Sequence, residues 1–117
     1  NTGCVNNMYD MFLNAESFNQ PLNWDTGCVR NMSKMFENAS KFNQMLNFDT
    51  GCVTDMMGMF HYAKSFNQPL NFDTSSVTDM GSMFSSAISF LGSVAITLAS
   101  ELNHSFLNSI RTAPSIQ

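Results

Sequence analysis

The sequence is poor in positive charge and has none of the long apolar runs that mark a membrane protein. Five Lys and Arg stand against nine Asp and Glu, whereas binding to the phosphate backbone of nucleic acid needs a clustered basic surface. No run approaches the ~18 apolar residues of a membrane span, and no signal peptide is visible. We therefore expect no nucleic-acid partner and no membrane span.

Residues that usually carry catalysis or hold cofactors are also scarce. Six Gly form no phosphate-binding loop, and neither of the two His belongs to a Cys–His arrangement. The three cysteines, Cys4, Cys28 and Cys52, are an odd number, so at least one thiol is free or pairs between chains. Buried thiols are favoured over a zinc site because no C-x-x-C accompanies them. We expect no cofactor, no metal and no enzymatic activity.

Methionine and phenylalanine are abundant, and a repeat of 24 residues explains both. Ten Met and eleven Phe occur in 117 residues. The spacing of 24 relates Val5, Val29, Val53 and Val77, and likewise the residues equivalent to Met8, Met11, Phe12, Ala15 and Phe18. It predicts a repeat domain over 1–90, with stacked repeats at 2–25, 26–49, 50–73 and a partial one at 74–90.

The first part of each repeat has the pattern of a short helix. Met8, Met11, Phe12 and Ala15 fall at i, i+3, i+4 and i+7, which is one face of an α-helix. Asn7 precedes them, and Asn is a favourable N-cap because its side-chain oxygen accepts from amides of the first turn. These positions predict a helix of about two turns in each repeat.

The second part of each repeat has the alternation of a strand. Leu22, Asn23 and Trp24 alternate apolar and polar residues, and Pro21 stands at the entry. Asp25 follows at a turn. The fold class expected is therefore an α/β repeat solenoid, similar to a leucine-rich repeat, with one short parallel strand and one short helix per repeat.

The signature MF-x-x-A-x-x-FNQPLN resembles the short tandem repeats of bacterial and mycoplasma surface lipoproteins, which are relatives of BspA-like leucine-rich repeats. The resemblance covers residues 1–90, although Met45 replaces the proline of the motif. It implies a solenoid, an extracellular or cell-surface location and a role in adhesion. It does not specify a partner.

Three columns of polar residues are candidates for a binding face. They comprise one Gln, one Asn and one Asp from each full repeat: Gln20, Gln44, Gln68, Asn23, Asn47, Asn71, Asp25, Asp49 and Asp73. The glutamines, together with Asn19 and its equivalents, are expected chiefly to form hydrogen-bonded ladders between repeats.

The Asp column has three interpretations. Turn capping, in which a carboxylate accepts from the amide two residues on, is preferred over calcium, because no D-x-D pattern is present. The strings Asp25-Thr26-Gly27 and Asp49-Thr50-Gly51 also match the D-T-G of aspartic proteases. Because these are consecutive copies of one turn, a hydrolase ranks third among the functions considered, behind binding and a structural or ice-binding role.

A column of threonines suggests another class of function. Thr2, Thr26, Thr50 and Thr74 recur every 24 residues, and an exposed Thr row could order water as ice-binding proteins do. An ice-binding, crystal-binding or purely structural repeat protein is therefore the main alternative to adhesion.

The two ends of the chain differ from the repeats. Residues 91–117 have apolar residues every four positions and predict an amphipathic helix, expected as a cap over the last repeat or as a partner-binding element. The first repeat has no such cap, so we expect further copies before it or self-association through that end. The function predicted is non-catalytic binding of a protein or surface glycan through a rigid polar face.

Overall fold

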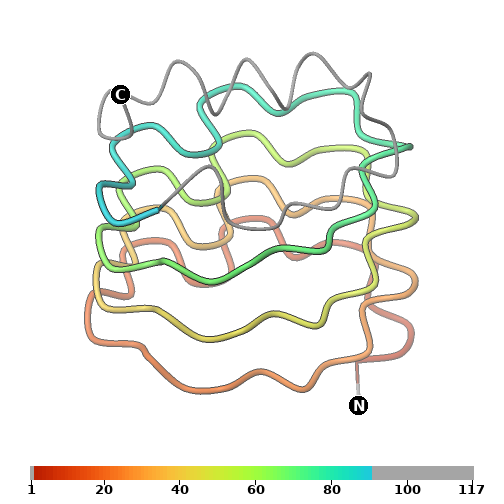
Figure 1. Ribbon diagram of the computed structural model, residues 1–117. Helices are drawn as coiled ribbons and strands as arrows, with labels where there is room; N and C mark the ends of the chain where they lie inside the picture. The colour runs from red at the N-terminus through yellow and green to blue at the C-terminus, as the bar shows by residue number, and fades with distance from the viewer. Residues whose placement is uncertain (1, 91–117) are drawn as a thin grey trace.

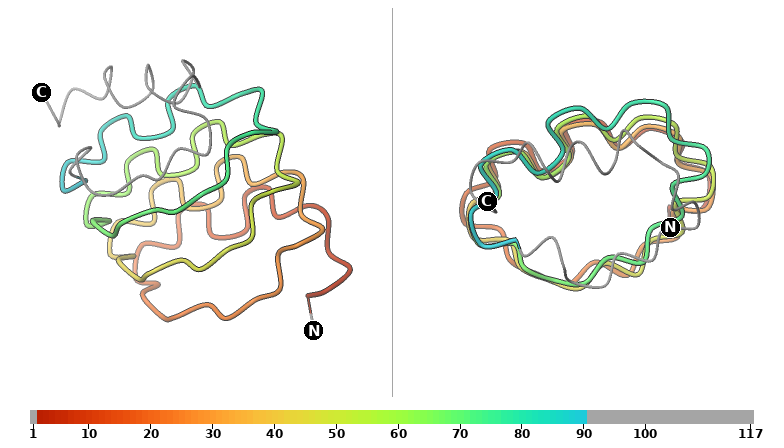
Figure 2. Two further views of the ribbon diagram at one scale, coloured as in Figure 1. Left: turned by 45° about the vertical axis from the view of Figure 1, so that its right-hand side comes forward. Right: turned by 45° about the horizontal axis from the view of Figure 1, so that its top comes forward.

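The computed structural model describes residues 2–90, which wind into four coils stacked one on another (Figure 1). Each coil takes up one repeat: coil 1 is 2–25, coil 2 is 26–49, coil 3 is 50–73 and coil 4 is 74–90. In the right-hand view of Figure 2, successive coils superpose on one flattened outline. Equivalent residues of successive repeats therefore lie above one another. The tail predicted as a helix, 91–117, lies outside the described residues.

The described residues contain no helix and no strand, so the expected α/β solenoid of leucine-rich-repeat type is wrong. Regular pairing is limited to isolated parallel bridges, which link Asn7 to Asn31, Asn31 to Asp55 and Asp55 to Asp79. No bridge forms at 22–24, where the alternation of residues predicted a strand. One paired residue per coil is too little to make a sheet.

A series of overlapping turns takes the place of the expected helix. We call residues 8–15 and their equivalents the turn segment. In coil 1, three N–H groups bond back to the carbonyl three residues earlier, at 3.2, 3.1 and 3.0 Å, and belong to Met11, Leu13 and Ala15. The intervening N–H groups donate to carbonyls of coil 2 at 2.8 to 3.1 Å, and belong to Met8, Asp10, Phe12 and Asn14. Backbone N–H groups thus alternate between hydrogen bonds within the turn and hydrogen bonds to the next coil. In an α-helix, all of them would bond to carbonyls of the same helix.

Left-handed backbone in the turn segment explains why no helix forms. Each coil has two residues with φ between +56° and +62°: Asp10, Asn14, Lys34, Asn38, Gly58, Tyr62, Ser82 and Ser86. A positive φ suits the third position of a type II turn. Within a right-handed helix it is excluded, and for a residue with a Cβ it costs roughly 1–2 kcal/mol. Asp, Asn and Gly tolerate it best, and they occupy half of these sites.

The residue expected to cap the helix performs the same task at the start of the turn segment. The Oδ1 atom of Asn7 accepts from the N–H of Tyr9 at 2.9 Å, and that of Asn31 accepts from Ser33 at 2.8 Å. Asp55 binds the N–H of Met57 in the same way at 3.0 Å. The predicted side-chain acceptor is confirmed, although no helix follows it.

Two columns of stacked phenylalanine rings fill the interior. One column joins Phe12, Phe36, Phe60 and Phe84 with ring centroids 5.5 to 5.6 Å apart, and the other joins Phe18, Phe42, Phe66 and Phe90 at 5.7 to 6.0 Å. Within a coil the two rings are stacked more closely: the centroids of Phe36 and Phe42, for example, lie 4.2 Å apart. Stacked pairs contribute about 0.5–1.5 kcal/mol beyond their burial. The periodic Phe and Met positions predicted as the core are confirmed as its main part.

Coil 1 is less completely covered than the coils that follow. Met11 is 46% exposed, whereas its equivalents Met35, Met59 and Met83 are at 0%. Phe12, Phe18 and Trp24 are only partly buried. These residues of coil 1 are less buried because no described coil lies against the side of coil 1 that faces away from coil 2.

Candidate ligand-binding face

Two columns of polar side chains run along the outer surface of the stack. They lie in the segment 18–26 and its equivalents, where they alternate with residues that point into the interior. The column members that are exposed are Asn23, Asn47, Asn71, Asp25, Asp49 and Asp73. Leu46 and Phe48, which alternate with them in coil 2, are buried. The alternation that predicted a strand thus does separate inward from outward residues, without strand pairing. We call these six residues the polar face.

The carboxylates of the polar face are held by the turns that follow them. The Oδ1 atoms of Asp25 and Asp49 accept from the N–H groups of Gly27 and Gly51, both at 3.0 Å. This bond confirms the predicted turn capping. A Cβ on Gly27 would lie 3.3 Å from Asp25 Oδ1 and 3.6 Å from Asp49 Oδ2, so successive carboxylates flank the glycine in a regular row.

The third carboxylate has an additional donor. Ser75 stands where the other two repeats have glycine, and its hydroxyl donates to Asp73 Oδ1 at 2.6 Å while its N–H donates to the same atom at 3.0 Å. The hydroxyl first, and then the amide, hold the pKa of Asp73 below its ordinary value of 3.8, because both stabilise the ionised form.

Replacing Ser75 with glycine should raise the pKa of Asp73 toward 3.8, since the hydroxyl is the larger cause of the depression. The folded pKa lies below the unfolded one, so ionised Asp73 stabilises the fold above pH 3.8, and this stabilisation is lost as the pH falls through the folded pKa. Titration of the Asp73 carboxyl carbon by NMR measures the shift. Ser76→Ala is the control, because the Ser76 hydroxyl donates instead to Gly51 O at 2.9 Å; an equal shift in both variants would contradict the assignment.

The glutamine column is engaged within the stack. Gln44 Nε2 donates to Asn19 Oδ1 at 3.0 Å, and the N–H of Asn43 donates to the same oxygen at 2.9 Å. Gln68 binds Asn43 in the same way, at 3.2 Å. The predicted amide ladder between coils is confirmed, although each Gln bonds to the Asn of the preceding coil and not to the equivalent Gln. Gln44 and Gln68 are therefore structural contacts between coils. Gln20, in coil 1, is exposed.

Three members of the threonine column, Thr26, Thr50 and Thr74, are buried, whereas the ice-binding alternative required an exposed row. Thr26 and Thr50 are each 1% exposed. Their hydroxyls donate to Asp49 O and Asp73 O at 3.0 Å. They join successive coils and present no row of hydroxyls to water, which removes the surface on which the ice-binding alternative depended.

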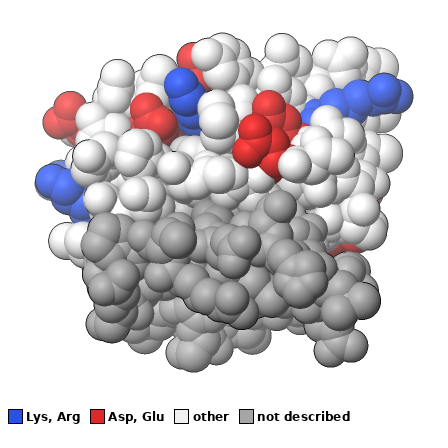
Figure 3. Space-filling view, turned by 90° about the horizontal axis from the view of Figure 1, so that it is seen from above, with Lys and Arg blue, Asp and Glu red and all other residues white. Residues whose placement is uncertain are grey.

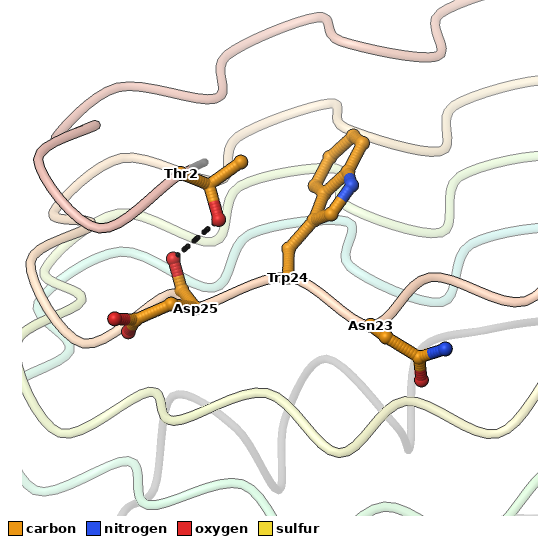
Figure 4. Close-up of a pocket in the computed structure, with 4 residues that line it drawn as sticks. All are labelled: Thr2, Asn23, Trp24 and Asp25. Carbon is orange, nitrogen blue, oxygen red and sulfur yellow. Dashed lines mark hydrogen bonds between the residues drawn. The ribbon is translucent and has the colours of Figure 1, made fainter.

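A shallow hollow of about 260 Å³ lies beside the only tryptophan. It is lined by Thr2, Asn23, Trp24 and Asp25. In Figure 4 the Trp24 ring and the Asn23 amide project to opposite sides of the backbone, and the Thr2 hydroxyl bonds to Asp25 O at 2.9 Å. Sequence reasoning did not single out Trp24, although it stands in a column otherwise occupied by Phe48 and Phe72 and marks coil 1 as different.

The cysteines and His61 are not grouped as metal ligands in the described part of the chain. Cys4, Cys28 and Cys52 are free and exposed, so the expectation of buried thiols is wrong. His61 Nδ1 lies 3.2 Å from Glu37 Oε1, an ion pair when the ring is protonated. No group of three or more His, Cys, Asp or Glu residues within 2–90 is placed to hold a metal. The Asp-Thr-Gly turns lie in successive coils of one row.

Charges of both signs are interspersed over the part of the surface visible in Figure 3. Neither sign forms a single large patch among the described residues of that view. Among residues 2–90, no helix is long and apolar enough to cross a bilayer.

The fold and the polar face together define a repeat protein of stacked coils. The model of the family described as "Mycoplasma protein of unknown function, DUF285" matches residues 1–48, which include all but the last residue of the first two repeats. No curated protein and no solved structure matches the chain. The match supports the mycoplasma part of the resemblance seen in the sequence; the relation to BspA-like leucine-rich repeats is not supported.

Proposed function

We propose that this chain is a non-catalytic repeat module of a surface or extracellular protein, and that it binds a protein or glycan through the polar face. The observation that carries the proposal is the exposure, in register, of Asn23, Asp25 and their equivalents on successive coils. Amides and carboxylates repeated at the spacing of the stack offer several identical contacts to one extended partner. Repeat proteins commonly bind through such extended surfaces.

The rigidity of the polar face favours binding over a merely structural role. Each Asp has one oxygen fixed by a turn amide, and the hydroxyls of Thr26 and Thr50 tie the turns at Asp25 and Asp49 to the next coil. Side chains that are already ordered lose less conformational entropy when a partner binds. The location and the adhesive role remain proposals that the mycoplasma family match makes reasonable.

The experiment removes the charge of the face and leaves its turns intact. In the triple variant Asp25→Asn, Asp49→Asn and Asp73→Asn, each amide oxygen can still accept from the turn N–H. Binding is measured by interferometry on a panel of immobilised matrix proteins and glycans. For a ligand that the native chain retains, we expect at least a tenfold loss of affinity.

A matched control comes from the turn segment. Asp55→Asn with Asp79→Asn also removes carboxylates that accept from turn amides, but at the start of the turn segment. This control should bind like the native chain. Equal losses in both variants, or none in the triple variant, would contradict the role of the polar face.

A further inference from the structure

Cysteines at equivalent positions of coils 1, 2 and 3 form a column of thiols. Cys4, Cys28 and Cys52 are free and exposed, and each is the third residue of a β-turn. In coil 2 the N–H of Val29 donates to Thr26 O at 3.0 Å, and the same turn recurs in the other coils. The thiols belong to neither the core nor the polar face. An oxidant in solution can reach all three of them.

Hydrogen bonds on both sides of the turn hold neighbouring cysteines in register. Two residues before the cysteine, the hydroxyl of Thr26 donates to Asp49 O at 3.0 Å. Two residues after it, the N–H of Thr54 donates to Arg30 O at 2.8 Å. The turns of coils 2 and 3 are thus joined at both ends, and those of coils 1 and 2 are joined in the same way. Parallel backbones that are hydrogen-bonded lie about 5 Å apart, within the ~4.4–6.8 Å between Cα atoms that a disulfide spans.

The fourth member of the column shows where a side chain at this position reaches. Ser76 stands in coil 4 where the other coils have cysteine, and its hydroxyl donates to Gly51 O of coil 3 at 2.9 Å. The Oγ atom is therefore directed along the stack, toward the residue that precedes Cys52. The sulfur of Cys52 in the same orientation would be directed toward the turn of Cys28. A bond between the two sulfurs requires this direction.

We infer that neighbouring thiols of the column are a disulfide site, at which one S–S bond joins two successive coils. The oxidant is a low-molecular-weight disulfide such as oxidised glutathione. One cysteine thiolate attacks it, forms a mixed disulfide and releases one glutathione thiolate. The neighbouring thiolate then attacks the protein sulfur of the mixed disulfide and releases the second. The two cysteines are oxidised, oxidised glutathione is reduced to two thiols, and the protons of the cysteines pass to these through water. Three cysteines allow one such bond at a time.

Three variants with two cysteines each distinguish neighbouring thiols from distant ones. Cys4→Ser keeps a pair in coils 2 and 3, and Cys52→Ser keeps a pair in coils 1 and 2. Cys28→Ser is the matched control, because its two thiols are separated by a whole coil and lie about 10 Å apart, beyond the ~7 Å limit between Cα atoms. Serine already occupies this position in coil 4, as Ser76, so all three variants should fold.

Mass spectrometry after incubation of the dilute proteins with oxidised glutathione gives the outcome. The two variants with neighbouring thiols should each lose two hydrogens and remain monomeric, whereas Cys28→Ser should retain a glutathione on each cysteine. In the native chain, trypsin yields one peptide, 1–30, with the first two cysteines and another, 42–64, with the third. A bond between coils 2 and 3 joins these peptides until dithiothreitol is added, and a bond between coils 1 and 2 lies within 1–30.

Unfolding by urea provides a second measurement. Oxidised Cys4→Ser should reach its midpoint at a higher urea concentration than the same variant in dithiothreitol, because the bond restricts the unfolded chain. Cys28→Ser should show no such gain. The inference is overturned if the variants with neighbouring thiols retain glutathione on both cysteines, or if Cys28→Ser closes a bond as readily as they do. Disulfide-linked dimers of all three variants would overturn it as well, and would assign the column to contacts between chains.

Discussion

Replacing Phe36 with alanine is expected to lower the free energy of unfolding by about 3–5 kcal/mol, the range found for a buried Phe. The ring is 0% exposed. It is stacked on Phe12, Phe42 and Phe60 with centroids 5.5, 4.2 and 5.6 Å away. Its loss leaves a cavity that interrupts one ring column between coils. Urea unfolding followed by circular dichroism measures the change.

Two further variants show whether the loss arises from the stacked column. Phe12→Ala removes the equivalent ring in coil 1, which is only partly buried, so it should cost less than Phe36→Ala. Met45→Ala, at a side chain 55% exposed, should change stability by no more than about 0.5 kcal/mol. Equal losses at Phe36 and Phe12 would count against a core that depends on stacking between coils.

Replacing Lys34 with proline is expected to cost about 3 kcal/mol or more. Lys34 has φ +56°, which the proline ring cannot adopt, and its N–H donates to Met57 O in coil 3 at 2.8 Å. The substitution therefore breaks a bond between coils and distorts the turn segment. The loss is measured by the same urea titration.

Lys34→Gly is the matched control, and it distinguishes the turn segment from a helix. At positive φ glycine relieves the strain of the Cβ, so we expect the chain to gain up to about 1 kcal/mol in stability. Gly58 already occupies the equivalent position in coil 3, with φ +62°. In a helix the same change would cost up to about 1 kcal/mol. Destabilisation by Lys34→Gly would therefore contradict the left-handed backbone at this site.

The core positions were predictable from the sequence although their secondary structure was not. Overlapping turns that recur every four residues bring positions i, i+3, i+4 and i+7 to one side, as an α-helix does. Met32, Met35, Phe36 and Ala39 are accordingly all at 0% exposure. Periodicity identifies the buried face, and it does not distinguish a helix from this series of turns.

Local residue types contained part of the missing information. Asp10, Asn14 and Asn38 stand at positive φ, and Gly58 takes the same place in coil 3. Such residues at a spacing of four are typical of repeated turns. Lys34 and Tyr62 have the same backbone conformation without this tendency, because the hydrogen bonds and ring columns between coils impose it. These contacts between coils form only when the repeats are stacked, so the sequence of one repeat does not reveal them.

The candidate site was predicted in part. The capping role of Asp25 and the ladder role of Gln44 follow from side-chain chemistry close to the turn, and both are confirmed. The direction in which Thr26 and Cys28 project depends on the path of the turn between coils, which the sequence pattern did not specify. Cys28 is exposed, although a buried thiol was expected, and Thr26 is buried, although the ice-binding alternative required it to be exposed.

The most direct test of the stacked coils is the NMR measurement of scalar couplings across backbone hydrogen bonds in the labelled chain. The structure predicts couplings from the nitrogen of Lys34 to the carbonyl carbon of Met57, and from that of Phe36 to Met59, across bonds of 2.8 Å in both cases. A coupling from the nitrogen of Phe36 to the carbonyl carbon of Met32, four residues earlier in the same repeat, would establish a helix and contradict the account.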